Sequence, residues 1–207
     1  SQNETKNAIP NILSDALAVS FDQQIGHDYF VDADERFDFY HKVEHKIPFD
    51  LDLFNKITNG GVPNKTLNVI LAGTGVGKSL FMCHHAANCY SANLNVLYIT
   101  CEMAEQRIAE RIDANLMDLT MDELRHLPKI TYDKKLQKAT ANIKSKLIVK
   151  EYPTATANVN HFRHLLEELK LKKNFTPDVV FIDYLNICAS ARFKIGGNTN
   201  SYMYIKS

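Results

Sequence analysis

The sequence has no excess of charge of either sign, because 24 basic and 24 acidic residues cancel within its 207 residues. It therefore has no global basic field of the kind that accompanies non-specific nucleic-acid binding. It also lacks any apolar run near the roughly 18 residues that a membrane-spanning helix needs, and it opens on no basic-then-apolar leader. We expect neither a membrane protein nor a secreted one, and we place the chain in the cytoplasm.

Paired cysteines are absent as well. The four cysteines show no C-x-x-C spacing and no other paired arrangement. Free thiols in a reducing cytosol are the simplest interpretation. The positions are Cys83, Cys89, Cys101 and Cys188.

The charge that is present is unevenly placed. Residues 1–50 carry ten acidic against four basic residues, whereas residues 129–150 carry seven lysines against Asp133 alone. A solvated helix face is the ordinary explanation for the lysines. The chain starts at Ser1 without an initiator Met and ends at Ser207, where a helix pattern is just beginning. We expect a piece of a longer protein.

From residue 67 onward, short apolar segments alternate with helical patterns. Unalternating apolar strands separated by helices predict an α/β fold with a mostly parallel sheet covered on both faces. We expect strands at 67–71, 95–100, 146–150 and 179–182, and helices at 78–92, 104–115, 120–143 (broken at Pro128) and 158–173.

The first part of the chain follows a different pattern. Apolar residues at helical spacing predict a short amphipathic helix at residues 10–21, with Pro10 at its start. Residues 22–47 are acidic and aromatic and give no clear assignment. We therefore divide the chain into a first segment at 1–46 and an α/β core at 47–207.

The stretch AGTGVGKS at 72–79 fits the phosphate-binding loop, with Ala72 where the strict pattern has Gly. Backbone N–H groups must turn inward around phosphate oxygens, which needs glycine conformations at Gly75 and Gly77. Lys78 would bridge the β- and γ-phosphates of ATP, and Ser79 would hold Mg²⁺. The predicted nucleotide-binding residues are Gly73, Thr74, Gly75, Val76, Gly77, Lys78, Ser79 and Leu80.

A phosphate loop needs a carboxylate for the hydration shell of the metal. The segment VVFID at 179–183 is an apolar strand ending in Asp183, as that second element requires. Many buried strands also end in a structural Asp. The phosphate loop upstream, with a further strand between, favours the metal-binding role.

Hydrolysis also needs a group that orients or deprotonates water. Glu102 directly follows the predicted strand at 95–100, so it should share the sheet edge with Lys78 and Asp183. A cap for the helix at 104–115 is the alternative role of Glu102. Asp183 as the base is a weaker alternative, because a metal-bound carboxylate is a poor base. Arg107 and Arg111 could reach a phosphate, although pairing with nearby acids is favoured.

Other histidines and cations give weaker signals. His84 and His85 fit packing or surface roles, and His161 and His164 share a helix face without a third metal ligand. The Gly- and Asn-rich stretch at 188–200 contains Arg192 and Lys194, which suit a phosphate backbone of DNA. An ordinary surface loop remains the alternative there.

Several stretches together resemble the RecA-type motor domain of DnaB-like replicative DNA helicases, and within that family those of T-even-type bacteriophages. The resemblance extends from about Ile9 to the end; the phosphate loop is generic, and the Glu-Met-Ala-Glu and Ile-Asp-Tyr-Leu pieces are more specific. The matching segments are TLNVILAGTGVGKSL at 66–80, VLYITCEMAE at 96–105, RIDAN at 111–115, LKLKKNF at 169–175 and VFIDYL at 180–185.

The resemblance implies a hexameric ring that moves on single-stranded DNA by ATP hydrolysis, with a primase and a helicase loader as partners. It implies that Glu102 is the catalytic base and Asp183 the Mg²⁺-associated carboxylate. It makes residues 1–46 a linker segment, whose helix at 10–21 would be the linker helix, and residues 47–207 a RecA-like ATPase core that is incomplete at its carboxyl end. The loop at 188–200 would face DNA. Because the family's arginine finger and sensor residue match nothing in this chain, we expect it alone to bind nucleotide but to hydrolyse it slowly. A phage origin would place it in the host bacterial cytoplasm.

Other functional classes share parts of this pattern. A RecA-like recombinase or regulatory ATPase has the same fold, loop and glutamate. A small-molecule kinase would need an acceptor pocket and an arginine-rich lid, which the sequence does not show convincingly. A non-catalytic scaffold is disfavoured by the presence of Lys78, Ser79, Glu102 and Asp183 together.

Overall fold

The computed structural model describes residues 26–42, 44–185 and 188. The chain divides into two compact units, residues 1–44 and residues 45–207. The predicted helix at 10–21 and the predicted DNA-facing residues Arg192 and Lys194 lie outside the described residues.

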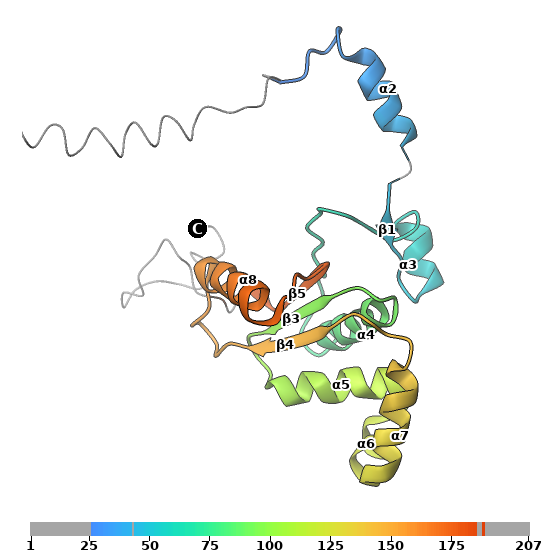
Figure 1. Ribbon diagram of the computed structural model, residues 1–207, viewed down its shortest axis with the longest axis vertical. Coiled ribbons are helices and arrows are strands. Elements are labelled where there is room, and N and C mark those ends of the chain that lie inside the picture. The colour runs from blue at the N-terminus through green and yellow to red at the C-terminus, as the bar shows by residue number, and fades with distance from the viewer. Residues whose placement is uncertain (1–25, 43, 186–187, 189–207) are drawn as a thin grey trace, which may run out of the picture. The chain divides into compact units, whose positions relative to one another are not determined.

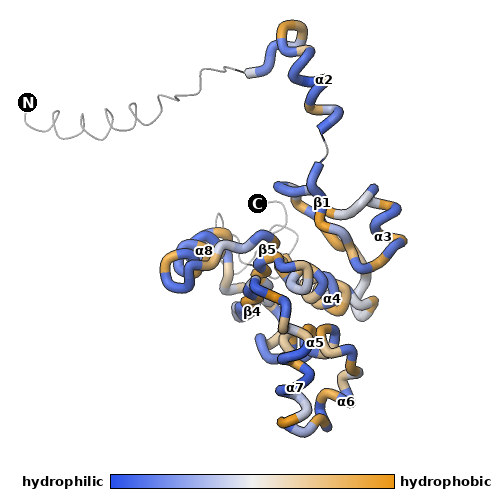
Figure 2. Tube along the Cα trace, turned by 45° about the vertical axis from the view of Figure 1, so that its right-hand side comes forward, coloured by the Kyte–Doolittle hydropathy of each residue, from blue (hydrophilic) through white to orange (hydrophobic). Residues whose placement is uncertain are grey.

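The described part of the first unit contains one helix, α2 (Ala33–His41). It buries no residue, and the trace is mostly hydrophilic along this helix (Figure 2). Aromatic side chains on and before it are exposed, Phe30 at 87% and Phe39 at 73%. Nothing within this helix therefore provides a core of its own.

The second unit is built on a three-stranded parallel sheet in the order β4-β3-β5 (Figure 1). The strands are β3 (Val96–Thr100), β4 (Leu147–Glu151) and β5 (Val179–Asp183). Val96 lies opposite both Leu147 and Val179, so the three strands start and end in register. The predicted α/β class with a parallel sheet is confirmed.

Helices cover both faces of this sheet, because successive strand residues point to opposite sides. Val96 and Tyr98 pack with α4 (Lys78–Ser91) and α5 (Glu105–Met117), whereas Leu97 and Ile99 pack with α8 (Val159–Lys173). Figure 1 shows α5 and α8 on opposite sides of the strands. All five residues of β3 are buried, as expected for a central strand.

Short elements complete this unit. The break predicted at Pro128 is confirmed, since it separates two short helices. No helix within the described ranges is long and apolar enough to cross a membrane. The remaining elements are β1 (Lys46–Ile47), α3 (Asp52–Ile57), β2 (Val62–Pro63), α6 (Met121–His126) and α7 (Lys129–Thr140), with β1 and β2 paired antiparallel.

The predicted strand at 67–71 is wrong. Residues 66–73 have no regular secondary structure, and the side chains of Leu67, Val69 and Leu71 are 90%, 78% and 94% exposed. A strand exists only where a neighbour takes up its backbone hydrogen bonds, and neither sheet of the described residues pairs with this segment. The apolar pattern indicates a capacity for a strand, but the pairing partner decides whether it forms.

Candidate functional site

The site begins at the amino end of α4. The helix starts at Lys78, and its cap residue is Gly77, with φ of 109° and no side-chain cap. The N–H groups of a helix's first turn have no partner within the helix. Because Gly77 supplies no side-chain acceptor, these donors are available to an anion, which the helix dipole also favours.

The glycines of the loop fit a phosphate group. Gly75 has φ of 75°, which with Gly77 gives two left-handed positions that other residues rarely adopt. A Cβ atom placed at either glycine would meet no atom of the described part of the chain within 4 Å. The loop thus leaves open space beside its own backbone, and glycine is needed there for conformation rather than for packing.

Lys78 folds back across this loop. Its half-buried ammonium donates to the carbonyl oxygens of Ala72 and Gly73, both at 2.9 Å. These bonds hold a cation at the centre of the loop, where an anionic ligand could take their place. Ser79 is half-buried beside it, whereas Gly73, Thr74, Gly75, Val76 and Leu80 are exposed.

The direction of α4 places this loop at the carboxyl ends of the strands. The helix ends at Ser91 and β3 begins at Val96, so the two elements run in opposite directions. Its amino end therefore lies at the edge where β3 and β5 end. Ligands of open α/β sheets bind at this edge.

Asp183 ends β5 at that edge and is only 1% exposed. One carboxylate oxygen, Oδ2, accepts the hydroxyl of Tyr98 at 2.9 Å. Thr100, the last residue of β3, lies directly opposite Asp183 in the parallel register. Burial raises the pKa of the Tyr98 hydroxyl, and the nearby Cys83 and Asp183 raise it further.

Glu102 follows two residues after the end of β3 and is exposed. The structure thus brings Glu102, Asp183 and the phosphate loop to one sheet edge. The alternative role as a helix cap is not seen, because α5 is capped by Ala104 without any side-chain bond. An exposed carboxylate at this edge is free to meet a water molecule near a bound phosphate.

The donor set at this edge suits Mg²⁺ with few protein ligands. A hydroxyl from Ser79 and a carboxylate from Asp183 are hard oxygen donors, and Mg²⁺ usually combines one or two such groups with waters and phosphates. Within the described residues, no three His, Cys, Asp or Glu side chains gather as a metal cage. The residues therefore fit a nucleotide-bound Mg²⁺ better than a transition metal.

The weaker candidates have structural roles. Arg107 pairs with Glu110 at 2.9 Å, as favoured from the sequence. His85 packs in the core, 6% exposed, and His161 caps α8 by accepting the N–H of Asn158 at 3.2 Å. His164 lies 3.8 Å from Glu168.

Sequence reasoning missed Tyr98 and Cys83. The Cys83 thiol, fully buried on α4, lies 3.8 Å from the Tyr98 hydroxyl. Burial raises the pKa of this thiol, while Tyr98 and Arg111 oppose the rise. A tyrosine in an apolar strand and a cysteine in a helix look like ordinary core residues, so no sequence signal distinguished them.

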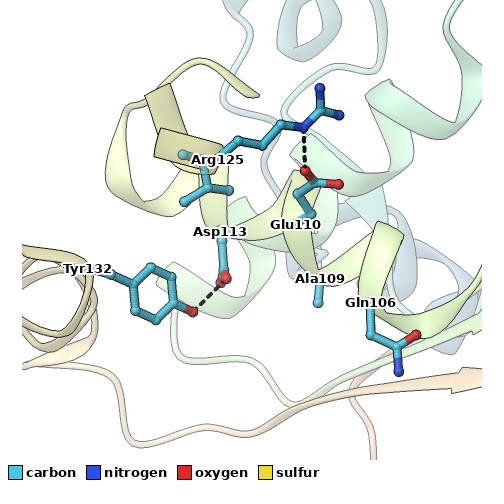
Figure 3. Close-up of a pocket in the computed structure, with 7 residues that line it drawn as sticks. Gln106, Ala109, Glu110, Asp113, Arg125 and Tyr132 are labelled. Atoms are coloured by element: carbon cyan, nitrogen blue, oxygen red, sulfur yellow. Dashed lines mark hydrogen bonds and ion pairs between the residues drawn. The ribbon is translucent and has the colours of Figure 1, made fainter. Parts of the chain in front are cut away.

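A separate hollow of about 330 Å³ lies among α5, α6 and α7 (Figure 3). Figure 3 shows the Tyr132 hydroxyl directed at Asp113, a hydrogen bond of 2.8 Å. Burial raises the pKa of the Asp113 carboxyl, while the Tyr132 bond opposes that rise. Glu110 forms ion pairs with Arg107 and Arg125, so most charges around the hollow are neutralised by neighbouring side chains.

Comparisons with known proteins match most of the chain. The family described as "DnaB-like helicase C terminal domain" matches residues 47–201. A protein of Enterobacteria phage T4, described as a DnaB-like replicative helicase, is 46% identical over 203 residues. The match spans 97% of this chain but 42% of that relative, so the chain covers less than half of the relative's length.

Solved structures show the same fold at low identity. One of them, described as an ATPase domain, has a TM-score of 0.62 and 19% identity, over 86% of this chain and 64% of that one. A DnaB-like replicative helicase studied for its interactions with primase has a TM-score of 0.59 and 19% identity, over 93% and 46%. The expected RecA-like arrangement of the core is thereby confirmed.

Proposed function

The chain belongs to the family of DnaB-like helicase C-terminal domains, and we propose that it is the ATP-hydrolysing motor of a replicative DNA helicase. One observation carries the proposal. The phosphate loop, Asp183 and Glu102 meet at the carboxyl edge of one parallel sheet. This arrangement combines an anion cradle, a metal-associated carboxylate and a candidate base.

The loop and Lys78 bind the nucleotide. Backbone N–H groups of residues 73–80 surround the phosphates, and the Lys78 ammonium moves from the carbonyls of Ala72 and Gly73 to phosphate oxygens. A charge-assisted bond to phosphate is stronger than one to a neutral carbonyl. Without nucleotide, the two carbonyl bonds keep the half-buried ammonium of Lys78 paired within the loop.

The remaining residues act on metal and water. The Ser79 hydroxyl and the Asp183 carboxylate would hold a nucleotide-bound Mg²⁺, Asp183 through water. The ion would supply positive charge that offsets the charge developing on the phosphate oxygens. Glu102 orients the attacking water and takes its proton. A positioned general base of this kind contributes typically about 10²–10⁴-fold to the rate.

The family match extends the proposal to the assembly. We propose that the motor works as a hexameric ring on single-stranded DNA, with a primase and a helicase loader as partners. The phage T4 relative supports action in the cytoplasm of a bacterial host. Arg192 and Lys194 remain candidates for DNA contact, and the helix at 10–21 for contact between neighbouring subunits.

The proposal is tested by measuring ATP turnover of the full-length parent protein with and without single-stranded DNA. We expect DNA to stimulate turnover at least about 10-fold and Glu102→Gln to lower it by about 10²-fold or more, with nucleotide binding kept. Lys78→Ala should lose nucleotide binding itself. Glu167→Gln is a matched control, since that glutamate is exposed on α8 far from the loop in sequence.

Two results would contradict the proposal in different ways. Turnover that ignores DNA but still needs Glu102 indicates a regulatory ATPase or kinase. DNA filaments formed without unwinding indicate a recombinase.

A further inference from the structure

A buried polar chain links the phosphate-loop helix to the carboxylate at the end of β5. The Cys83 thiol lies 3.8 Å from the Tyr98 hydroxyl, and that hydroxyl donates to Oδ2 of Asp183 at 2.9 Å. Cys83 and Tyr98 are 0% exposed, and Asp183 is 1% exposed. The chain therefore crosses from α4 through β3 to β5 in the interior of the domain, and it ends at Asp183 on the carboxyl edge of the sheet.

The ring of Tyr98 is fixed independently of its hydroxyl. It stacks on Phe181 with centroids 5.8 Å apart and an interplanar angle of 17°. A buried hydroxyl needs a hydrogen-bond partner, and the partner here is a carboxylate rather than a backbone carbonyl. The stacked ring consequently sets the direction from which Asp183 receives its hydrogen bond.

The same chain reaches the other half of the metal site. Ser79 and Cys83 are four residues apart on α4, so they lie one above the other on the same helix face. Cys83 shows that this face looks toward Tyr98. The predicted hydroxyl ligand Ser79 therefore lies at one end of this chain of contacts, and the predicted metal carboxylate Asp183 lies at the other end.

We propose that Tyr98 is a positioning residue for the Mg²⁺ site: its hydroxyl holds Oδ2 of Asp183 and leaves the second carboxylate oxygen for the water ligands of the ion. This inference rests on the proposed nucleotide-binding function. Groups that orient metal ligands typically change metal affinity or activity about 10–100-fold when removed. Because Asp183 acts through water, an effect near the lower end of that range is expected.

The positioning role of Tyr98 is tested by measuring the Mn²⁺ affinity of the full chain, with ADP present, by electron paramagnetic resonance. We expect Tyr98→Phe, which keeps the stacked ring, to weaken Mn²⁺ affinity about 10-fold. ADP affinity measured in EDTA should stay unchanged, a separation that a general packing defect would not produce. Tyr132→Phe is the matched control, because it removes the same kind of bond, 2.8 Å to Asp113, away from the loop.

The variant Asp183→Asn distinguishes the positioning role of Tyr98 from the proposed metal-binding role of Asp183. If Asp183→Asn loses Mn²⁺ affinity while Tyr98→Phe stays within about twofold of the unaltered chain, the positioning role is refuted and the proposed function stands. If Asp183→Asn also leaves the affinity unchanged, the metal assignment fails and the positioning role fails with it.

A second measurement applies if Tyr98→Phe does not fold. In the unaltered chain labelled with ζ-¹³C-tyrosine, the Tyr98 resonance is identified by its shift in Asp183→Asn. Mg²⁺ with ADP should move this resonance, whereas ADP in EDTA should not. A resonance that ignores Mg²⁺ overturns the proposal.

Discussion

At the scale of single residues, His85 shows how burial fixes a protonation state. Its ring is 6% exposed and stacks on Phe49 at 4.5 Å, with Phe181 at 5.7 Å. Its Nδ1 atom is buried and has no hydrogen-bond partner among the described residues. Burial, and secondarily the neighbouring His84, lower the pKa of His85 to about 4.

This lowered pKa predicts acid sensitivity. The unfolded chain binds a proton at His85 near pH 6.5, whereas the folded chain does so only near pH 4, so the free energy of unfolding falls as pH drops between these values. Between pH 7 and pH 5 the loss should be about 2 kcal/mol, measured by urea unfolding. His85→Leu should flatten this dependence, and His126→Gln, at an exposed position, should leave it in place. An equally steep loss in His85→Leu would assign the sensitivity to another group.

Sequence patterns indicate some residues of the candidate site and not others. Lys78, Glu102 and Asp183 could be singled out because each follows an apolar strand pattern or a glycine-rich loop at a spacing that the chemistry requires, and their roles remain predictions. Tyr98 could not, because its hydroxyl has a partner only through the register of β3 and β5. Pairing register is a long-range property that a local pattern does not contain.

At the scale of elements, the helices after residue 77 and the three strands of the parallel sheet could be predicted from periodicity. The helices α2 and α3 were not predicted, and the strand predicted at 67–71 was wrong. An apolar run specifies a buried strand only if a neighbour completes its hydrogen bonds, and here the described sheets leave it unpaired. The start of α8 shows the opposite case, since a local signal fixes it. Asn158 accepts the N–H groups of Asn160 and His161, and His161 accepts the N–H of Asn158 in return.

Removal of this cap should destabilise the domain measurably. Asn158→Ala leaves first-turn N–H groups without their acceptor, and we expect it to lower the free energy of unfolding by about 1 kcal/mol. Urea unfolding at neutral pH measures the change. Asn160→Ala, at an exposed position in the same turn, is the control and should change stability by less than about 0.5 kcal/mol. Equal effects of the two substitutions would mean that the capping bonds contribute nothing.

At the scale of the whole molecule, the two units contribute unequally to the core. Both hydrophobic clusters draw their described members from Ile47 onward, and α2 buries no residue. The division of the chain into a linker segment at 1–46 and a core at 47–207 remains a prediction. The sequence indicated it, because residues 22–47 are acidic and aromatic and give no clear assignment, whereas strands and helices alternate from residue 67 onward.

Residues 45–207 should therefore keep their stability without residues 1–44. If residues 1–44 are a linker, as predicted, deleting them should change stability by less than about 0.5 kcal/mol, which for a domain of this size shifts Tm by less than about 2 °C. Ile47→Ala within 45–207 calibrates the measurement, because Ile47 is 8% exposed in the core and its truncation should cost about 2 kcal/mol or more. Scanning calorimetry measures the Tm of the full chain, the shortened chain and this variant. If the deletion lowers Tm as far as Ile47→Ala does, residues 1–44 pack on the core and the predicted linker is part of the folded domain.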